Sequence, residues 1–490
     1  MSNPELSPRV KARTATGESE VRVISRAKVA SGSRTSGAGT NGPGTSRSGT
    51  SGSSTSRSGT SGSGSSGYGS SRAGAGRDIG WYWGSQTASA IGDRLTGFAV
   101  PSIAILTLNA SSAEVGVLAA LGWLAYPALG LFAGAALAHV QRRRVMITGE
   151  VMRFAVFATV PLAALGGWVT TAQLFVVVAV AGIATVFVDI AGQSYLPALV
   201  DPRSLVGANA KLQSSDSFSK LVGPALAGLA LKTTDPYAGL LLCALPFLGS
   251  AAGRTRIQTL EPPLERAQDP LSARIRQGFT FVWQHPLLRQ LVVAAAIRSF
   301  GAGMVDAVLL LFAYRVLGLS SLEGGLLIAA GSIGGLLGAF IANRLAARLG
   351  TRRTLLLTGV EALCWLTIPI CLVTAPVIAL VLIRICASIW LPVWNIVTTS
   401  VRQELTPTGL QSPVHATART LTSSTVPLGA ITGGLAGGVL SDQLGTRTGL
   451  VLVLAVGGAI AGASALLVVR SQEITATPRE VECVQPQREP

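Results

Sequence analysis

Apolar residues form long continuous runs along most of this chain, beginning at Trp81 and ending near residue 470. Each run is long enough to cross a hydrocarbon layer of about 30 Å as a helix of about 20 residues. The runs do not alternate in polarity every second residue, which favours helices over the strands of a membrane barrel. The pattern predicts twelve membrane-spanning helices, at residues 82–108, 113–139, 145–167, 171–194, 206–231, 236–252, 289–316, 323–347, 354–375, 377–401, 414–440 and 447–469.

Basic residues fall on alternate connections between these runs. Connections after odd-numbered runs are short and nearly free of Lys and Arg, whereas those after even-numbered runs carry arginines, among them Arg142, Arg143 and Arg144. Lys and Arg accumulate in the cytoplasmic loops of membrane proteins. The asymmetry therefore predicts a multi-pass protein of the cell (cytoplasmic) membrane with both termini in the cytoplasm.

Five segments of different composition follow one another. Residues 1–80 are rich in Ser, Gly and Arg, with about eleven Lys and Arg against four acids, and are expected to be a disordered cytoplasmic tail. Residues 81–252 and 289–470 are expected to form two six-helix bundles. Residues 253–288 would be a cytoplasmic linker with an interfacial helix, and residues 471–490 a second cytoplasmic tail. The predicted fold class is all-α and membrane-integral.

The two predicted bundles are related by an internal repeat of about 205–210 residues. Residues 143–150 contain Arg-Arg, Thr-Gly and Glu in the same order as residues 352–361. Two parallel halves of six helices are typical of transporters that rock around a site between the halves. The repeat thus favours a transporter.

Composition supports a membrane protein and excludes several other classes. Of the 490 residues, 13% are charged and the mean hydropathy is +0.50, whereas ordinary soluble proteins carry roughly 25% charged residues. The net charge of +16 lies mostly in the first tail and the basic loops, so we interpret it as a topology signal rather than as a nucleic-acid site. Five scattered cysteines and three histidines predict neither a disulfide framework nor a metal site. Without a Gly-Lys-Ser/Thr loop, a pump driven by its own ATP hydrolysis is not expected, and no cofactor is predicted.

Three segments carry a family resemblance. Residues 92–96 (Gly-Asp-Arg-Leu-Thr), residues 193–199 (Gln-Ser-Tyr-Leu-Pro-Ala-Leu) and the linker residues 276–289 resemble signatures of the major facilitator superfamily, in its bacterial drug and siderophore efflux branch. That branch includes macrolide efflux pumps and the enterobactin exporter, and the resemblance covers about residues 82–470. It implies a monomeric, non-enzymatic secondary transporter that exports a small amphipathic compound by alternating access and proton antiport.

Gly223, Pro224 and Gly228 resemble the antiporter motif of the fifth helix in exporters. Small residues permit close helix contact, and proline bends a helix and frees a carbonyl group. A generic packing kink is the alternative.

The connection between the second and third runs is similar to the hallmark loop of the family, with Gly134 and the arginines Arg142, Arg143 and Arg144. The family's aspartate position is occupied by Ala138. The resemblance implies that an acid at this position latches the cytoplasmic gate, so this departure puts the latch in doubt.

Ionisable residues inside the predicted spans are candidates for coupling or gating, because a charge at the centre of a bilayer costs about 2.5–3.5 kcal/mol on insertion scales. These candidates are Asp93, Arg94, Asp189, Arg298, Asp306, Arg384, Glu150 and Glu361. The resemblance implies that helices one, four, seven and ten line a central cavity, with Asp93 or Asp306 as the proton carrier. Structural ion pairs are the alternative, and for Glu150 and Glu361 gate or packing contacts are favoured.

Aromatic side chains are candidates for the substrate wall. Trp390 and Trp394 lie one turn apart in the tenth run, next to Asn395, and Trp123 and Tyr126 lie in the second run. A cavity for bulky amphipathic molecules needs aromatic area with few polar anchors. Aromatic residues also anchor helices at the lipid interface, which is the alternative.

Two other functions fit the same pattern of runs. One is an importer of the same fold, for a siderophore or a nutrient. The other is a non-transporting membrane sensor or scaffold whose basic tail recruits partners.

Overall fold

The computed structural model describes residues 72–137, 140–201, 204–259, 271–373 and 376–469. These residues belong to one compact unit. They are almost entirely helical, and no strand occurs among them. Ala138, most of the first tail and the whole second tail lie outside the described residues.

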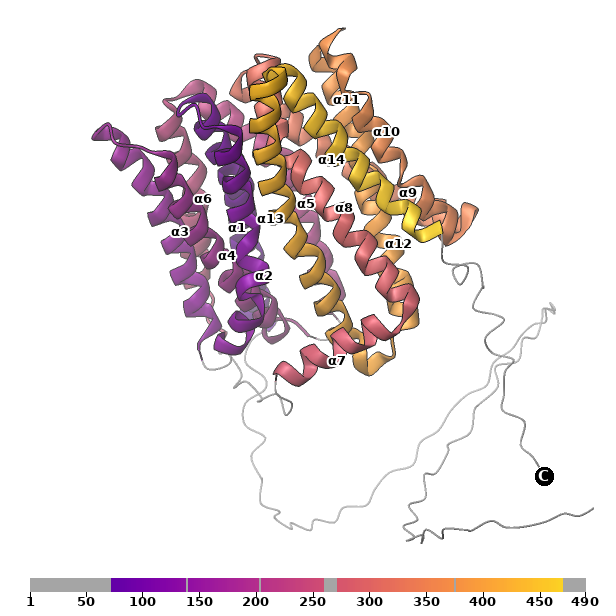
Figure 1. Ribbon diagram of the computed structural model, residues 1–490. Coiled ribbons are helices and arrows are strands. Elements are labelled where there is room, and N and C mark those ends of the chain that lie inside the picture. The colour runs from indigo at the N-terminus through magenta and orange to yellow at the C-terminus, as the bar shows by residue number, and fades with distance from the viewer. Residues whose placement is uncertain (1–71, 138–139, 202–203, 260–270, 374–375, 470–490) are drawn as a thin grey trace, which may run out of the picture. The chain divides into compact units, whose positions relative to one another are not determined.

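The first half of the described chain forms six helices (Figure 1). They are α1 (Arg72–Leu106), α2 (Ser112–Ala136), α3 (Arg142–Leu165), α4 (Thr171–Leu199), α5 (Leu205–Thr233) and α6 (Pro236–Thr255). Polar residues define several of the ends. The Thr170 side chain accepts a hydrogen bond from the backbone N–H of Gln173 at the start of α4, and Asp235 caps α6 in the same way. Helix α1 packs against α5 and α6, and α3 packs against α4 and α6.

The second half begins with the short amphipathic helix α7 (Leu271–Gln284), which ends before Pro286. The later elements are α8 (Pro286–Leu311), the π-turn η3 (Phe312–Val316), α9 (Ser321–Leu357), α10 (Val360–Leu366), η4 (Ile368–Leu372), α11 (Pro376–Ser388), α12 (Trp390–Leu405), η5 (Thr408–Leu410), α13 (Gln411–Leu444) and α14 (Thr446–Val469). Helix α13 packs against α8 and α14, and α9 packs against α11 and α12.

Helix boundaries differ from the predicted spans at several places. Helix α1 begins at Arg72, within the segment expected to be disordered, and the Asp78 side chain there accepts hydrogen bonds from the backbone N–H groups of Gln258 and Thr259. Helix α9 runs through Gly350, whose φ of 78° turns the chain between the eighth and ninth predicted spans. The tenth predicted span is divided at Ile389.

Eight helical segments among the described residues are long and apolar enough to cross a membrane. Helices α1, α5 and α13 are not among them, and these helices carry many polar side chains. The ninth predicted span is also absent, because it is divided into the short pieces α10 and η4. The fold class is therefore confirmed as all-α and membrane-integral, while the count of twelve crossings stays a prediction.

We call α1–α6 the first bundle and α8–α14 the second bundle, and the two sets contact each other along pairs of helices. Helix α2 lies against α13, and α5 lies against α9. We call the end of the bundles that holds α7 the linker end and the opposite end the distal end (Figure 1). Among the described residues, every hydrogen bond between the bundles lies in the distal half or near the middle, including those of Ser102 with Tyr314 (2.8 Å) and Ser321 with the Gly228 carbonyl (3.2 Å). The distal end is thus closed.

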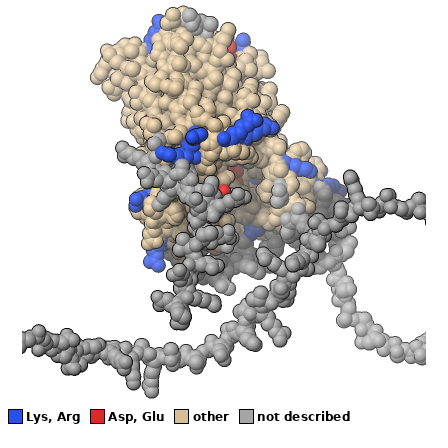
Figure 2. Space-filling view, turned by 90° about the vertical axis from the view of Figure 1, so that its right-hand side faces the viewer, with Lys and Arg blue, Asp and Glu red and all other residues tan. Residues whose placement is uncertain are grey.

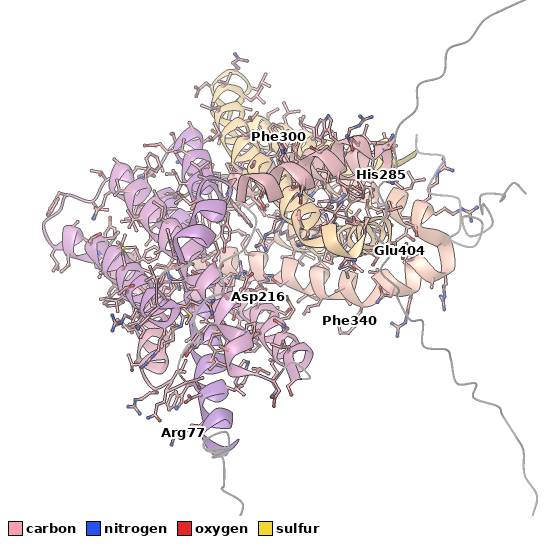
Figure 3. The ribbon with its side chains drawn as sticks, turned by 90° about the horizontal axis from the view of Figure 1, so that it is seen from below. Arg77, Asp216, His285, Phe300, Phe340 and Glu404 are labelled. Atoms are coloured by element: carbon pink, nitrogen blue, oxygen red, sulfur yellow. The ribbon has the colours of Figure 1, made fainter. Side chains whose placement is uncertain are left out.

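The outer surface of the bundles is apolar. Figure 2 shows a broad area of uncharged side chains on one side, above a row of Lys and Arg. Large apolar residues point outward, such as Phe340 on α9, which is 71% exposed and lies at the outer edge in the view from below (Figure 3). Large apolar side chains that point outward in this way are typical of a protein surrounded by lipid.

Candidate functional site

The two adjacent charges of α1 reach different helices. Asp93 forms an ion pair with Arg153 of α3 at 2.6 Å, whereas Arg94 pairs with Asp216 of α5 at 2.9 Å. Lys220 also contacts Asp216, at 2.6 Å. Successive residues on a helix point about 100° apart, so neighbours in sequence face different partners. Asp93 and Arg94 therefore each form an ion pair with another helix, and these pairs hold α1 to α3 and to α5.

Glu150 is the centre of a fully buried charge cluster in the first bundle. Its carboxylate contacts the guanidinium group of Arg153, lies 3.0 Å from that of Arg254 and accepts a hydrogen bond from Ser250 at 3.0 Å. The exposed fraction is 0% for Glu150 and Arg254 and 1% for the Arg153 side chain. A buried charge needs such pairing, since an unpaired ion in a low-dielectric interior is strongly disfavoured.

Further polar groups accept hydrogen bonds from the two arginines in this cluster. Arg153 donates to Ser89 at 2.7 Å and to Thr185 at 3.2 Å. Arg254 donates to the side-chain oxygen of Gln86 at 3.0 Å and to the Met146 carbonyl at 3.2 Å. The cluster therefore ties four helices, α1, α3, α4 and α6, to one another. Arg254 falls in the predicted linker of residues 253–288, whereas the structure has it inside the last turn of α6.

Asp189 of α4 lies at the face of the first bundle that meets the second. It accepts a hydrogen bond from the hydroxyl group of Tyr126 on α2. The guanidinium group of Arg419, on α13 of the other bundle, lies 5.9 Å from the centre of the Tyr126 ring. Tyr126 therefore contacts a polar group in each bundle. Trp123, on the same helix, is exposed instead.

The second bundle holds its own buried pair. Arg298 of α8 contacts the carboxylate of Glu361 on α10, and the two side chains are 2% and 11% exposed. The Arg298 guanidinium also lies 5.5 Å from the ring centre of Trp394. A guanidinium group over an aromatic face gains further electrostatic stabilisation. Trp394 is thus part of the packed interior in this conformation, 1% exposed.

Asp306 and Arg384 form a looser pair in the second bundle. The nearest side-chain nitrogen and oxygen atoms are 3.8 Å apart, and the Asp306 side chain is 54% exposed. Trp390 is half-buried and Asn395 is exposed, on α12. Asp306 and Asn395 are accordingly open to contact from outside the protein, in contrast to Trp394.

The small residues of the antiporter-like segment lie at close helix contacts. A Cβ atom on Gly223 would lie 2.5 Å from the Cβ atom of Arg94, and one on Gly228 would lie 2.4 Å from the Ser321 carbonyl oxygen. The Pro224 carbonyl would be 2.3 Å from a Cβ atom on Gly325. The segment therefore brings α5 against α1 within the first bundle and against α9 across the interface.

Two of the arginines that follow α2 donate hydrogen bonds to carbonyl groups at helix ends within the first bundle. Arg142 donates to the Ser194 carbonyl at 3.0 Å, near the end of α4, and Arg143 donates to the Arg254 carbonyl at 3.0 Å, at the end of α6. Cations stabilise the carbonyl ends of helices. Arg144 is exposed, and Gly134 lies within α2.

No group of three or more His, Cys, Asp or Glu that could hold a metal is present in the described ranges. The arrangement offers instead two sets of ion pairs between helices, in which the carboxylates of Asp93, Asp216 and Asp306 are partly accessible. Groups of this kind can take up and release protons, and their charge state changes the contacts between helices.

Comparisons with known proteins agree with this architecture. The family model of the Major Facilitator Superfamily matches residues 82–421. The chain is 29% identical over 358 residues to the multidrug efflux pump Tap of Mycolicibacterium fortuitum, which covers 71% of this chain and 86% of Tap. It is 30% identical over 204 residues to the uncharacterized MFS-type transporter y4rN of Sinorhizobium fredii (strain NBRC 101917 / NGR234), covering 41% of this chain and 48% of that protein.

Solved structures show the same fold at low sequence identity. A bacterial homologue of the iron transporter ferroportin in its inward-facing state aligns with a TM-score of 0.64 and 20% identity, over 81% of this chain and 99% of that chain. A bacterial homologue of the human lysosomal transporter Spinster, inward-facing and unoccupied, aligns with a TM-score of 0.66 and 14% identity, over 81% and 97% of the two chains.

Proposed function

Because the chain belongs to the Major Facilitator Superfamily, we propose that it is a secondary transporter that exports a small amphipathic organic compound, such as a drug, an antibiotic or a siderophore-like molecule, in exchange for protons. The similarity to the efflux pump Tap, over 86% of that protein, supports export. The relative accessibility of Asp93 within an otherwise buried charge cluster is the observation that carries the coupling mechanism.

The linker end is proposed to face the cytoplasm. Arg142, Arg143 and Arg144 lie at this end, as do the exposed Arg344 and Arg348 of α9. Such a concentration of basic residues supports cytoplasmic termini and a location in the cell membrane. We also propose that residues 1–80 and 471–490 are cytoplasmic tails on either side of the two six-helix bundles.

The closed distal end supports an inward-facing state in an alternating-access cycle. On the α2–α13 side, a Cβ atom on Gly434 would lie 2.6 Å from the Ser112 carbonyl oxygen, and on the α5–α9 side Gly228 makes the equivalent contact with Ser321. Opening the distal end requires both contacts to separate. Rocking of one bundle against the other would do this without rearranging the bundle interiors.

Asp93 is the proposed proton carrier of the first bundle. Its side chain is 33% exposed, whereas its partner Arg153 is 1% exposed and also contacts Glu150. When Asp93 takes a proton, Arg153 keeps its contact with Glu150, whose carboxylate then serves both Arg153 and Arg254. The contact between α1 and α3 is then weakened without leaving a buried arginine unpaired, and the balance between the two conformations shifts.

Asp306 is the corresponding carrier in the second bundle. Its separation of 3.8 Å from Arg384 and its exposure of 54% leave it open to protons. Trp390, Asn395 and Trp123 remain the proposed contacts of the compound, since none of them is fully buried.

Everted membrane vesicles provide the test. A resistance screen first identifies a transported compound, with ethidium as the initial probe. In respiring vesicles with an acidic interior, adding the compound to vesicles that contain the wild-type protein should release protons, measured as recovery of acridine orange fluorescence. We expect Asp93→Asn to abolish this release and Asp306→Asn to reduce it at least about tenfold, because each removes an ionisable carboxyl group.

Asp235→Asn is the matched control. Asp235 is a partner of backbone N–H groups at the start of α6, and Asn caps helices as well as Asp does, so its transport should equal that of the wild type. Full pH-gradient-dependent transport in both Asp93→Asn and Asp306→Asn would disprove the coupling assignment. Accumulation of the compound by intact cells that express the protein would disprove export.

A further inference from the structure

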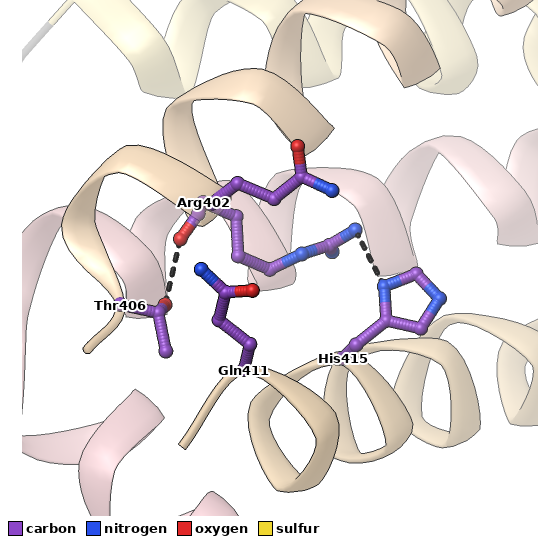
Figure 4. A pocket seen from close by; sticks show the side chains of 5 residues that line it. Arg402, Thr406, Gln411 and His415 are labelled. Carbon is purple, nitrogen blue, oxygen red and sulfur yellow. Dashed lines mark hydrogen bonds between the residues drawn. The ribbon is translucent and has the colours of Figure 1, made fainter. Parts of the chain in front are cut away.

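A polar cavity lies at the linker end of the second bundle, away from the ion pairs described above. It has a volume of about 250 Å³ and is lined by Arg402, Gln403, Thr406, Gln411 and His415. The end of α12 and the first turns of α13 form its walls, and Figure 4 shows Arg402, Gln411 and His415 turned toward one another around it. These side chains offer several hydrogen-bond donors and no carboxylate.

Arg402 differs from the buried and half-buried arginines that belong to the ion pairs described above. Arg94, Arg153, Arg254, Arg298 and Arg384 each contact a carboxylate. Within the described part of the chain, Arg402 forms no ion pair, and its hydrogen bonds come from Nη2 alone, to Thr399 at 3.2 Å and with Nδ1 of His415 at 3.3 Å. Its Nε and Nη1 groups therefore keep three N–H donors for a ligand.

The surroundings of Arg402 add positive potential rather than cancel it. Arginine cannot accept a hydrogen bond, so Nδ1 of His415 must accept, which leaves Nε2–H as a further donor. Helix α13 begins at Gln411, directly after η5, and its N-cap residue Leu410 makes no side-chain hydrogen bond, so the partial positive charge of this helix end is not offset by a capping side chain. Glu404 lies two residues from Arg402, about 200° around the helix, and forms no ion pair in the described ranges.

An apolar cleft adjoins the cavity at Arg402. It has a volume of about 20 Å³, and Leu288, Leu291 and Val292 of α8 are among its walls. Arg402 lines both spaces. A ligand whose charged group reaches Arg402 would therefore place its adjoining carbon atoms against an apolar surface.

We propose that this cavity binds the anionic group, a phosphate or a carboxylate, of an amphipathic molecule. The guanidinium group of Arg402 would hold the anion by its charge and by a charge-assisted hydrogen bond from Nη1 or from Nε, which lie on different edges of the group. The His415 Nε2–H group would supply a further donor, and the start of α13 would add positive potential. The molecule is either an acidic membrane lipid or a soluble amphipathic anion that enters from the linker end, and both present the same chemistry.

Isothermal titration of the full-length protein in phosphatidylcholine nanodiscs tests the site, with decyl phosphate as the probe and empty nanodiscs as the baseline. The wild type should show one saturable site for decyl phosphate and at least about tenfold weaker binding of decylphosphocholine, in which a choline group offsets the charge. Arg402→Gln should weaken decyl phosphate binding at least about tenfold, and His415→Gln about threefold.

Arg402→Lys and Arg348→Gln are the companion variants. Lysine keeps the charge, so binding should stay within about fivefold of the wild type, which separates loss of the charge from loss of folding. Arg348 is exposed at the same end and does not line the cavity, so its replacement should change binding less than about twofold. Equal binding by Arg402→Gln and the wild type, or equal binding of the two probes, would overturn the proposal.

A change of the nanodisc lipid identifies the source of the anion. If an acidic lipid occupies the cavity, phosphatidylglycerol should compete with decyl phosphate in the wild type, but not in Arg402→Gln. If phosphatidylglycerol leaves the wild-type titration unchanged, the site takes a soluble anion. Both outcomes require the charge of Arg402, and neither depends on the direction of transport.

Discussion

Replacing Glu150 by Gln should strongly destabilise the first bundle. In the described part of the chain, Glu150 is the one carboxylate within ion-pair distance of Arg254, at 3.0 Å, and both side chains are 0% exposed. Arg153 would keep its ion pair with Asp93 at 2.6 Å. Only Arg254 therefore loses its counter-charge, and removal of one partner from a buried pair costs about 3–5 kcal/mol.

A double variant separates the loss of the carboxylate from the burial of an unpaired charge. In Glu150→Gln/Arg254→Met the orphaned guanidinium is absent, and replacing a whole buried pair is often close to neutral. We expect this variant to recover at least about half of the stability lost by Glu150→Gln alone. The hydrogen bonds of Arg254 with Gln86 and the Met146 carbonyl are lost as well, which limits the recovery.

Reversible unfolding in mixed micelles with increasing dodecyl sulfate, followed by circular dichroism, measures these free energies. Glu404→Gln is the control, because Glu404 is exposed on α12 and has no ion pair in the described ranges, and its replacement should change stability by less than about 0.5 kcal/mol. A loss below about 1 kcal/mol for Glu150→Gln, or a double variant as unstable as the single one, would refute the reasoning.

Three other substitutions test the contacts between helices. Gly434→Val places a side chain within 2.6 Å of a backbone oxygen of α2, so hydrogen exchange at the distal ends of α2 and α13 should rise at least about tenfold. Tyr126→Phe removes the hydroxyl group that Asp189 accepts from, and the unfolding free energy should fall by about 1–3 kcal/mol. Trp394→Ala should cost about 3–5 kcal/mol because its side chain is buried, whereas exposed Trp123→Ala should cost less than about 1 kcal/mol in the same unfolding assay.

Hydrophobic pattern alone predicts most of the helices, because the length of an apolar run is a local property. The breaks have weaker local signals. Gly350 is one glycine among many, and its positive φ is required only because α9 turns back there. The early start of α1 depends on Asp78 reaching Gln258 and Thr259, which lie about 180 residues later in the chain. Long-range contacts of this kind leave no mark in a hydropathy profile.

The candidate charges could be selected from the sequence, but their partners could not. A charge within an apolar run is conspicuous, and the family resemblance, confirmed by the family match, directed attention to α1 and α8. The pairing of Asp93 with Arg153, rather than with the adjacent Arg94, depends on which faces of α1 meet α3 and α5. The burial of Trp394 beneath Arg298 similarly depends on the packing of α8 against α12.

The two bundles carry an ion pair at the same position of the repeat, but the acid and the base have exchanged helices. This difference bears on coupling. Asp93 and Arg298 are one repeat apart, and each joins the first helix of its bundle to the third, through Arg153 and Glu361. An ion pair that only holds two helices together can have its acid on either helix. A proton carrier must be an accessible acid, and the acid of the first pair is 33% exposed while that of the second is 11% exposed. The exposed fractions therefore favour Asp93 over Glu361 as a carrier and leave Asp306, two turns beyond Arg298, as the accessible acid of the second bundle.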